Sequence, residues 1–464
     1  MDMIENLTFD EIQPGDSATL KRTLSKEDIE LFAIMSGDVN PAHVDAEYAR
    51  SDMFHKIIAH GMWGAALIST LLGTKLPGPG TIYLDQSLHF HHPVLIGDTI
   101  TVTVTATAKE VEHHRISFDC SCINQRGDVV ISGNAEVMAP TTKVKRPRAM
   151  LPEIHLHEHG TMYRHLIALT SGLPPIRTAV VHPVDSNALL GAIEAAHANL
   201  IIPYLVGPAD RIYAVAAAQD VDLSPYTVVP TEHSHAAAEK AVSMVRAGEV
   251  DAIMKGSLHT DELMQAVVAP GTGLTTDRRM SHVFMMDVPT YPRPLFITDA
   301  VLNIAPDLAA KRDIVQNAIL LAHALGIQAP KVAILSAVET VNPSLKSSVD
   351  AAALCKMAER GQITGGIVDG PLAFDNAVSV EAAHTKGIVS PVAGQADILV
   401  VPDLDAGNML EKQLAYLADA QDAGIVVGAR VPIILTSRAD SPLARMASCT
   451  LALLLAQGKG KATH

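Results

Sequence analysis

The spacing of apolar residues changes once along the chain, and this change constrains the fold more than any other feature. Before residue 140, Ile100, Val102 and Val104 alternate with threonines, which is typical of a half-buried strand. From about residue 168 the order is strand, turn, helix, repeated. Residues 141–152, with four basic residues and two prolines, fit neither pattern. We therefore expect a domain in residues 1–140, a linker in 141–160 and a second domain in 161–464.

The first domain is expected to contain one long buried helix over Gly61–Thr74. This stretch is almost wholly apolar, and ~14 residues at 1.5 Å each would span roughly 21 Å, about the width of a sheet. Shorter helices are predicted from Ser25 to Met35, where Ser25 can act as a cap, and over Asp45–Met53. The alternating strands that follow predict an antiparallel sheet wrapped around the long helix.

The second domain is expected to be a mostly parallel sheet with helices on both faces, because strand-like and helix-like stretches alternate. The strand-like stretches are Thr178–Val184, Leu200–Gly207, Thr227–Glu232, Val250–Lys255, Leu295–Asp299, Val332–Ala337, Ile363–Asp369, Ile398–Pro402 and Val431–Thr436. Helical patterns include Ser186–His197, His235–Arg246, Leu308–Leu325, Ser347–Arg360 and Pro442–Gln457. Ligands in such folds lie at the carboxyl ends of the strands.

Composition excludes some classes of function. The formal charge of −15 argues against a nucleic-acid partner, because nothing neutralises a phosphate backbone in bulk. No apolar run reaches the ~18 residues that a membrane span needs, and the N-terminus lacks the pattern of a signal peptide. The four cysteines show no metal-site spacing. We expect a cytoplasmic protein that binds neither a membrane nor a structural metal.

Residues 36–43, Ser-Gly-Asp-Val-Asn-Pro-Ala-His, are the first candidate site. Gly37 and Asn40-Pro41 can bend the backbone sharply, so that Asp38 and His43 converge on one small volume. An acid and an imidazole so placed can hold a water and move its protons, as addition of water to a double bond requires. The alternative is a helix-capping Asp38 beside an unrelated His43.

This segment, with Phe32 before it and the run from His60 to Ile68 after it, resembles the MaoC-like, R-specific enoyl-CoA hydratases. The resemblance covers residues 1 to about 140 and implies a hotdog fold that pairs with a second copy. It also implies that Asp38 and His43 activate water, that Asn40 belongs to the substrate site, and that the backbone N–H of Gly61 binds the thioester oxygen. Gly61 can instead be a packing glycine, and His60 is interpreted as structural. A thioesterase is a further reading of this half.

Several later blocks resemble the phosphate acetyl- and butyryltransferases. They are Asp369–Asn376, Ser390–Gly394, Asp397–Pro402, Asp403–Asn408 and Thr436–Asp440. The resemblance runs from about residue 160 to the C-terminus and implies two α/β subdomains with a cleft, in which coenzyme A and phosphate exchange on a short acyl group.

The resemblance also suggests which residues perform that exchange. Arg438 suits a phosphate oxygen pair, Ser437 adds a hydroxyl, and a second arginine would be Arg278 or Arg279. Acetyl-type relatives carry an aspartate seven positions after the serine as base for the thiol; here that position is Ala444, and Asp440 is the nearest substitute or else a helix cap. The segment Thr436–Asp440, Thr-Ser-Arg-Ala-Asp, looks like the butyryl branch of the family. The remaining substrate-binding candidates lie at strand ends and in glycine-rich blocks: Lys255, Asp369, Asp375, Asp403 and Asn408.

Taken together, these features predict a bifunctional enzyme. One half would hydrate a trans-2-enoyl-CoA to an R-3-hydroxyacyl-CoA, and the other would convert an acyl-CoA and phosphate to an acyl phosphate. Coenzyme A thioesters and phosphate are then substrates, no cofactor or metal is implied, and a homo-oligomer is expected. The alternative is that one half has lost its chemistry and serves as an acyl-CoA-binding regulatory or assembly module.

Overall fold

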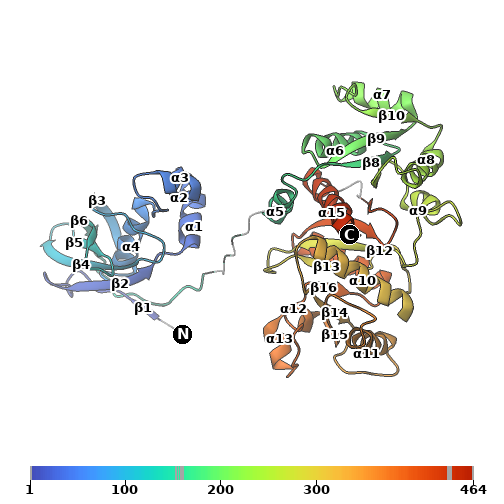
Figure 1. Cartoon of the computed structure of the whole chain (residues 1–464). Coiled ribbons are helices and arrows are strands. Elements are labelled where there is room, and N and C mark those ends of the chain that lie inside the picture. The colour runs from blue at the N-terminus through green and yellow to red at the C-terminus, as the bar shows by residue number, and fades with distance from the viewer. Residues whose placement is uncertain (1–2, 152–153, 155, 157–160, 436–440, 462–464) are drawn as a thin grey trace. The chain divides into compact units, whose positions relative to one another are not determined.

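The computed structural model describes residues 3–151, 154, 156, 161–435 and 441–461. The chain forms two compact units, residues 1–157 and 158–464, which are described separately below (Figure 1). Among the described residues, no helix is both long enough and apolar enough to cross a membrane.

The N-terminal unit is a five-stranded antiparallel sheet with one long helix, α4 (Gly61–Thr74), packed on it. The strands lie in the order β2–β4–β5–β6–β3. Their bounds are β2 (Ser17–Thr23), β3 (Ile82–Phe90), β4 (Thr99–Glu110), β5 (Arg115–Ile123) and β6 (Val129–Met138). The pair β1 (Met3–Glu5) and β7 (Lys145–Pro147) forms a separate antiparallel ribbon, and α1 (Lys26–Ser36), α2 (Pro41–Val44) and α3 (Ala46–Ser51) precede α4. The predicted hotdog architecture is confirmed.

The alternation of apolar residues sets the register of this sheet. Val102 lies opposite Cys122 and Val104 opposite Cys120, and all four side chains are buried against the helix side of the sheet. The intervening threonines face away, as a period of two requires. The predicted half-buried strand is therefore confirmed.

One prediction for α4 is wrong. The helix was expected to be buried on every side, yet it has a single buried face, which includes Trp63, Ile68 and Leu71. On the opposite face Met62 is 57% exposed and Thr70 is exposed. The large apolar side chains fall on one face, whereas the other positions hold mostly Gly, Ala, Ser and Thr, which lose little by contact with water.

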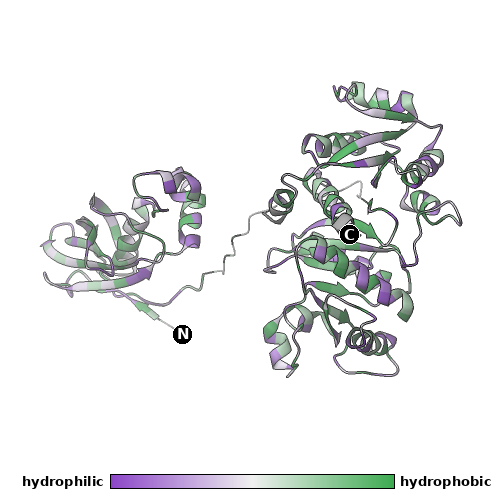
Figure 2. Cartoon of the chain, in the orientation of Figure 1, coloured by the Kyte–Doolittle hydropathy of each residue, from purple (hydrophilic) through white to green (hydrophobic). Residues whose placement is uncertain are grey.

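The C-terminal unit contains one eleven-stranded sheet in the order β10–β9–β8–β11–β18–β17–β12–β13–β16–β14–β15. Its strands are β8 (Ile176–Val181), β9 (Ile201–Gly207), β10 (Thr227–Pro230), β11 (Ala252–Lys255), β12 (Ser281–Asp287), β13 (Leu295–Thr298), β14 (Lys331–Leu335), β15 (Ile367–Leu372), β16 (Ile398–Val400), β17 (Gln421–Val427) and β18 (Ile433–Ile434). Figure 2 shows that these strands are largely hydrophobic. Central parallel strands are buried on both faces, so they read as continuous apolar runs.

Helices cover this sheet, as expected. They are α5 (Thr161–Leu169), α6 (Ser186–His197), α7 (Ala209–Ala218), α8 (Ser234–Arg246), α9 (Thr260–Val268), α10 (Leu308–Ala324), α11 (Lys346–Glu359), α12 (Phe374–Val378), α13 (Val380–Thr385), α14 (Leu404–Leu417) and α15 (Pro442–Lys461). In Figure 1, α15 lies centrally, and it contacts α5, α6 and α10 as well as β17 and β18. The predicted fold class, an α/β unit with two subdomains, is confirmed.

The two subdomains meet at strands that the sequence did not reveal. Strands β10, β9, β8, β11 and β18 are mutually parallel, as are β13, β16, β14 and β15. Between these two sets, β17 and β12 run antiparallel to each other and to their outer neighbours. The sheet is therefore continuous, and the seam between the two subdomains is an antiparallel pair.

Two candidate active sites

The loop after α1 brings Asp38 and His43 together by local hydrogen bonds. Gly37 ends α1 with a positive φ of 74°, a left-handed conformation that glycine adopts without strain. Asn40 is the N-cap of α2, since its Oδ1 accepts from the N–H of Ala42 at 3.1 Å. The Asn40 N–H in turn donates to Oδ1 of Asp38 at 3.2 Å. Asn40 therefore shapes the turn, and its predicted contact with substrate stays a prediction.

The ring of His43 is held by one of its two nitrogens. Its Nδ1 lies 2.9 Å from the carbonyl oxygen of Ile58, an acceptor, so Nδ1 carries the proton and Nε2 keeps a lone pair. A carboxylate oxygen of Asp38, a ring nitrogen of His43 and a ring nitrogen of His60 all lie within 4.8 Å of one another. The predicted convergence of acid and imidazole is present in the structure.

His60 belongs to this cluster, although the sequence indicated only a structural histidine. It is the N-cap residue of α4 and is only 3% exposed. Its Nε2 lies 2.9 Å from the backbone oxygen of Asp38, and its ring centroid lies 4.0 Å from that of His43. Its position directly before Gly61 was the one signal in the sequence that this histidine lies near the site.

A cavity of about 290 Å³ opens beside this cluster, lined by residues that include His43, His60, Gly61, Phe90 and Ile131. Gly61 is the first residue of α4, so its N–H belongs to the free donors at a helix N-terminus, where the helix dipole favours negative charge. A Cβ added to Gly61 would lie 3.0 Å from the ring of Phe90. Gly61 is thus compatible with both predicted roles: its N–H is free to donate, and its lack of a side chain allows Phe90 to pack closely.

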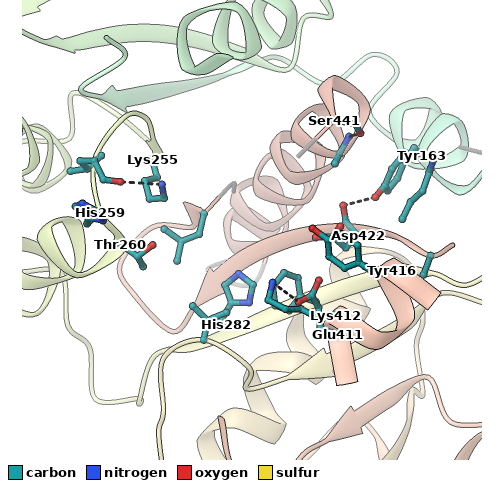
Figure 3. A pocket seen from close by; sticks show the side chains of 18 residues that line it. Tyr163, Lys255, His259, Thr260, His282, Glu411, Lys412, Tyr416, Asp422 and Ser441 are labelled. Atoms are coloured by element: carbon teal, nitrogen blue, oxygen red, sulfur yellow. Dashed lines mark hydrogen bonds and ion pairs between the residues drawn. The ribbon is translucent and has the colours of Figure 1, made fainter. Parts of the chain in front are cut away.

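The second candidate site is a cavity of about 630 Å³ in the C-terminal unit (Figure 3). Its wall includes Tyr163 of α5, Lys255 at the end of β11, His282 of β12, Glu411 of α14 and Asp422 of β17. Lys255 was predicted at a strand end, and its ammonium group donates to the carbonyl of Leu258 at 3.2 Å. The cavity therefore lies where strands of both subdomains meet, as the topological rule for α/β sheets predicts.

Described residues on both sides of the segment with the predicted serine and arginine line this cavity. Ser437, Arg438 and Asp440 lie outside the described residues. Leu435, directly before that segment, and Ser441, directly after it, both line the cavity. Ala444, which stands where acetyl-type relatives were said to carry an aspartate, lines it too.

Burial shifts the pKa values of two groups in this cavity. His282 is 1% exposed, and burial lowers its pKa from 6.5 to about 3, so the imidazole is neutral at physiological pH. Burial also raises the pKa of Asp422, whose backbone oxygen accepts a hydrogen bond from the hydroxyl of Tyr163. The sequence pointed to neither His282 nor Asp422, because the strands that carry them were not predicted.

The two candidate arginines line a different cavity, of about 970 Å³, with Asn303 and Asp313 among its other residues. The side-chain Nε of Arg279 donates to Oδ1 of Asn303 at 2.8 Å, and the backbone N–H of Arg279 donates to the carboxylate of Asp313. Within the described residues, the guanidinium of Arg278 has no such partner. Arg278 is therefore the better placed of the two to bind an anion.

The other predicted substrate-binding residues have local structural contacts and are not part of the walls of these cavities. Asp369 accepts a hydrogen bond from the next N–H, that of Gly370, at 2.8 Å. Asp375 forms a surface ion pair at 3.5 Å with Lys386. Asp403 is the N-cap of α14, and Asn408 reaches the carbonyl of Ala300 at 3.5 Å. Their contact with substrate stays a prediction.

Comparison with known proteins identifies both parts of the chain. The family described as "Phosphate acetyl/butaryl transferase" matches residues 227–452, and "MaoC like domain" matches residues 11–121. A phosphate acetyltransferase of Rhizobium meliloti is 61% identical over 63% of this chain and 93% of its own length. A phosphate butyryltransferase of Clostridium acetobutylicum is 42% identical over 61% of this chain and 94% of its own length.

A solved structure agrees with the transferase match. A branched-chain phosphotransacylase from Enterococcus faecalis V583 is 31% identical, covers 61% of this chain and 99% of its own, and has a TM-score of 0.53. The predicted resemblance to both families is therefore confirmed. The chain belongs to the phosphate acetyl/butaryl transferase family and carries a MaoC-like domain in its N-terminal part.

Proposed function

We propose that the C-terminal unit transfers an acetyl group between coenzyme A and phosphate. The observation that carries this proposal is the 630 Å³ cavity at the seam between the subdomains, in a chain 61% identical to a protein named phosphate acetyltransferase. The blocks around Thr436 to Asp440 suggested the butyryl branch, but the butyryltransferase relative is only 42% identical. The higher identity favours acetyl.

The reaction in this cavity needs a cation and a proton donor. A phosphate oxygen attacks the thioester carbonyl, the tetrahedral intermediate expels the coenzyme A thiolate, and the thiolate takes up a proton, which leaves acetyl phosphate and coenzyme A. Two lysines line the cavity, Lys255 and Lys412, and Lys412 forms an ion pair with Glu411 at 3.7 Å. Lys255, at the end of β11, is therefore the proposed cation. The family resemblance suggests that Arg438 and Ser437 bind the phosphate. Asp440 is the candidate base for the thiol in the reverse direction, because residue 444, an aspartate in acetyl-type relatives, is an alanine here.

The test is thiol release from acetyl-CoA and from butyryl-CoA by the purified full-length protein, with and without phosphate. We expect phosphate-dependent release that is faster with acetyl-CoA. Arg438→Ala is expected to lower it at least about a hundredfold, as loss of a single transition-state donor does. Arg211→Ala, an exposed position on α7, serves as the matched control. A wild-type rate with Arg438→Ala would refute the role of Arg438.

We further propose that the N-terminal unit adds water to a trans-2-enoyl-CoA. The supporting observation is the cluster of Asp38, His43 and His60 beside a cavity that Gly61 also lines. Asp38 and Nε2 of His43 would hold a water, take one of its protons while its oxygen bonds to C3, and deliver a proton to C2. The N–H of Gly61 would stabilise the enolate oxygen in between. The product is a 3-hydroxyacyl-CoA.

The test of this second activity is the loss of enoyl absorbance of crotonyl-CoA, followed by chiral analysis of the product. We expect the R-3-hydroxy product. Hydrolysis to free coenzyme A instead would favour the thioesterase reading, and absence of both would favour a binding module.

A second copy of the chain is the proposed partner. Strand β3 is an edge of the sheet and leaves Ile82, Tyr83, Leu84 and Phe90 exposed. An edge strand with exposed apolar side chains is a site for strand pairing. Sedimentation of wild type and Leu84→Lys tests this, since we expect the substitution to lower the mass of the assembly. An unchanged mass would exclude this edge as an interface.

A further inference from the structure

His60 joins three parts of the N-terminal site. Its Nε2 lies 2.9 Å from the backbone oxygen of Asp38, across 22 residues of sequence. Its ring lies against the ring of His43, with centroids 4.0 Å apart and planes 34° apart. It is also the residue that precedes Gly61 at the start of α4. One side chain therefore contacts both the backbone of Asp38 and the ring of His43, and it belongs to the residue that precedes the first residue of α4.

The hydrogen-bond geometry defines the tautomer of His60. A carbonyl oxygen only accepts hydrogen bonds, so Nε2 carries the proton and donates to Asp38. The other ring nitrogen, Nδ1, is buried and has no hydrogen-bond partner among the described residues. The ring of Phe32 lies 5.0 Å away. The bond to Asp38 is thus the polar contact that orients this ring.

We propose that His60 is a positioning residue of the hydration site, which holds the Asp38 backbone and the His43 ring at a fixed separation by donating from Nε2 and by stacking. The inference rests on the proposed hydratase activity. His60 need not touch the substrate, because it acts on the placement of Asp38 and His43. Small displacements of reacting groups are costly in rate, on the order of a hundredfold for about 1 Å.

A histidine that only fills space would behave differently from one that positions. Phenylalanine at residue 60 keeps a flat ring against His43 but has no donor for Asp38. Glutamine keeps a donor at about the reach of Nε2 but has no ring. The pair His60→Phe and His60→Gln therefore separates packing from hydrogen bonding. His89→Gln, an exposed position on β3, is the matched control.

The experiment measures kcat and KM for crotonyl-CoA hydration by the full-length variants. With His60→Phe we expect kcat to fall roughly a hundredfold with KM changed less than about threefold. With His60→Gln we expect kcat within about tenfold of wild type, and no change with His89→Gln. Wild-type kcat with His60→Phe, or an equal loss with both His60 variants, would overturn the proposal.

A second readout does not depend on activity. Hydrogen exchange of the peptide over residues 36–45 reports on the amides of Asn40, Ala42 and His43, which are bonded within the loop. We expect His60→Phe to speed this exchange roughly fivefold, the effect of one lost hydrogen bond, and His60→Gln to leave it unchanged. Unchanged exchange with His60→Phe would overturn the proposal. Faster exchange in a protein whose wild type shows no hydration would instead refute the proposed activity and leave the positioning contact established.

Discussion

The ring of His282 occupies the space that Gly424 leaves open on the neighbouring strand. A Cβ added to Gly424 would lie 2.8 Å from Nε2 and 2.9 Å from Cε1 of this imidazole, closer than side chains approach in proteins. Gly424 of β17 lies opposite Phe284 of β12, so His282, which lies opposite Val426, reaches it diagonally across the antiparallel pair that joins the subdomains. The absence of a side chain on one strand thus decides where a buried, neutral imidazole lies in the wall of the 630 Å³ cavity.

Gly424→Ala is therefore expected to displace His282. The backbone oxygen of Leu435, 3.2 Å from the added methyl, leaves little room on the other side. We expect a loss of about 1–3 kcal/mol in stability, typical of an overpacked core, and reduced phosphate-dependent thiol release. Hydration of crotonyl-CoA is expected to stay unchanged. Gly458→Ala, whose methyl would meet only Ala324 at 3.8 Å, is the control, and equal effects of both variants would contradict the prediction.

The buried His282 makes stability depend on pH. Its pKa is about 3 in the folded protein against 6.5 for the unfolded chain, so below pH 6.5 the unfolded state binds a proton that the folded state does not. The free energy of unfolding therefore falls as the pH is lowered, by roughly 2–3 kcal/mol between pH 7 and pH 4.5. His282→Asn removes this contribution, so its stability should depend less on pH than that of wild type.

Urea unfolding followed by far-ultraviolet circular dichroism measures this difference. Trp63 is the only tryptophan of the chain and lies in the N-terminal unit, so its fluorescence is an internal control. Equal pH slopes for wild type and His282→Asn would show that the histidine does not remain neutral in the folded protein.

Asp38→Ala tests whether the two activities are independent. The carboxylate beside His43 is expected to be essential for hydration, with a loss of at least about a hundredfold in kcat, while phosphate-dependent thiol release stays at the wild-type rate. Asp10→Ala, an exposed aspartate of the same unit, is the control. Loss of both activities with Asp38→Ala would undermine the separation into two sites.

Arg278 and Arg279 should give opposite results. Arg279 holds Asn303, which is 4% exposed, so Arg279→Ala leaves a buried acceptor without its donor and is expected to cost about 1–3 kcal/mol of stability. Arg278→Ala is expected to leave stability unchanged and to raise KM for phosphate or acetyl-CoA roughly tenfold or more, the worth of one charge-assisted hydrogen bond. Thermal unfolding and initial-rate kinetics of both variants distinguish the two roles, and a higher KM with Arg279→Ala alone would reverse the assignment.

The sequence predicted most of the fold because the spacing of apolar residues and the residues that favour turns are signals carried by short stretches of chain. Helix α6, for example, has the predicted bounds Ser186–His197, and each predicted strand of the second domain overlaps an observed one. Strands β12 and β17 escaped prediction because their residues do not alternate between apolar and polar, although each strand follows a helix in the chain. They run antiparallel in the centre of a sheet that was expected to repeat strand and helix.

The candidate sites were predictable in the same local sense. Asp38 and His43 converge through bonds within eight residues, so their motif was sufficient. His60 bonds to Asp38 although the two residues are 22 positions apart in the sequence, and the ring of His282 lies against Gly424 of the neighbouring strand. Such contacts depend on tertiary packing, which single-residue patterns do not encode. Asp375 and Asp403 show the converse, because their glycine-rich surroundings suited a ligand site as well as the ion pair that Asp375 makes and the helix cap that Asp403 makes.

Gly61 provides the sharpest test of the hydration site, since its two readings predict different outcomes for two substitutions. It is the first residue of α4, a position where proline is favoured in helices, and His60 before it has an extended ψ of 134° that a following proline tolerates. Gly61→Pro should therefore keep the helix, add the same Cβ that Gly61→Ala adds and remove the N–H donor, with a loss of about 10²–10³ in kcat. Gly61→Ala keeps the donor and only shifts the exposed ring of Phe90, so we expect activity within about tenfold of wild type. Crotonyl-CoA hydration by the two variants decides between the readings: equal losses would make Gly61 a packing residue, whereas a loss confined to proline would assign its N–H to the thioester oxygen.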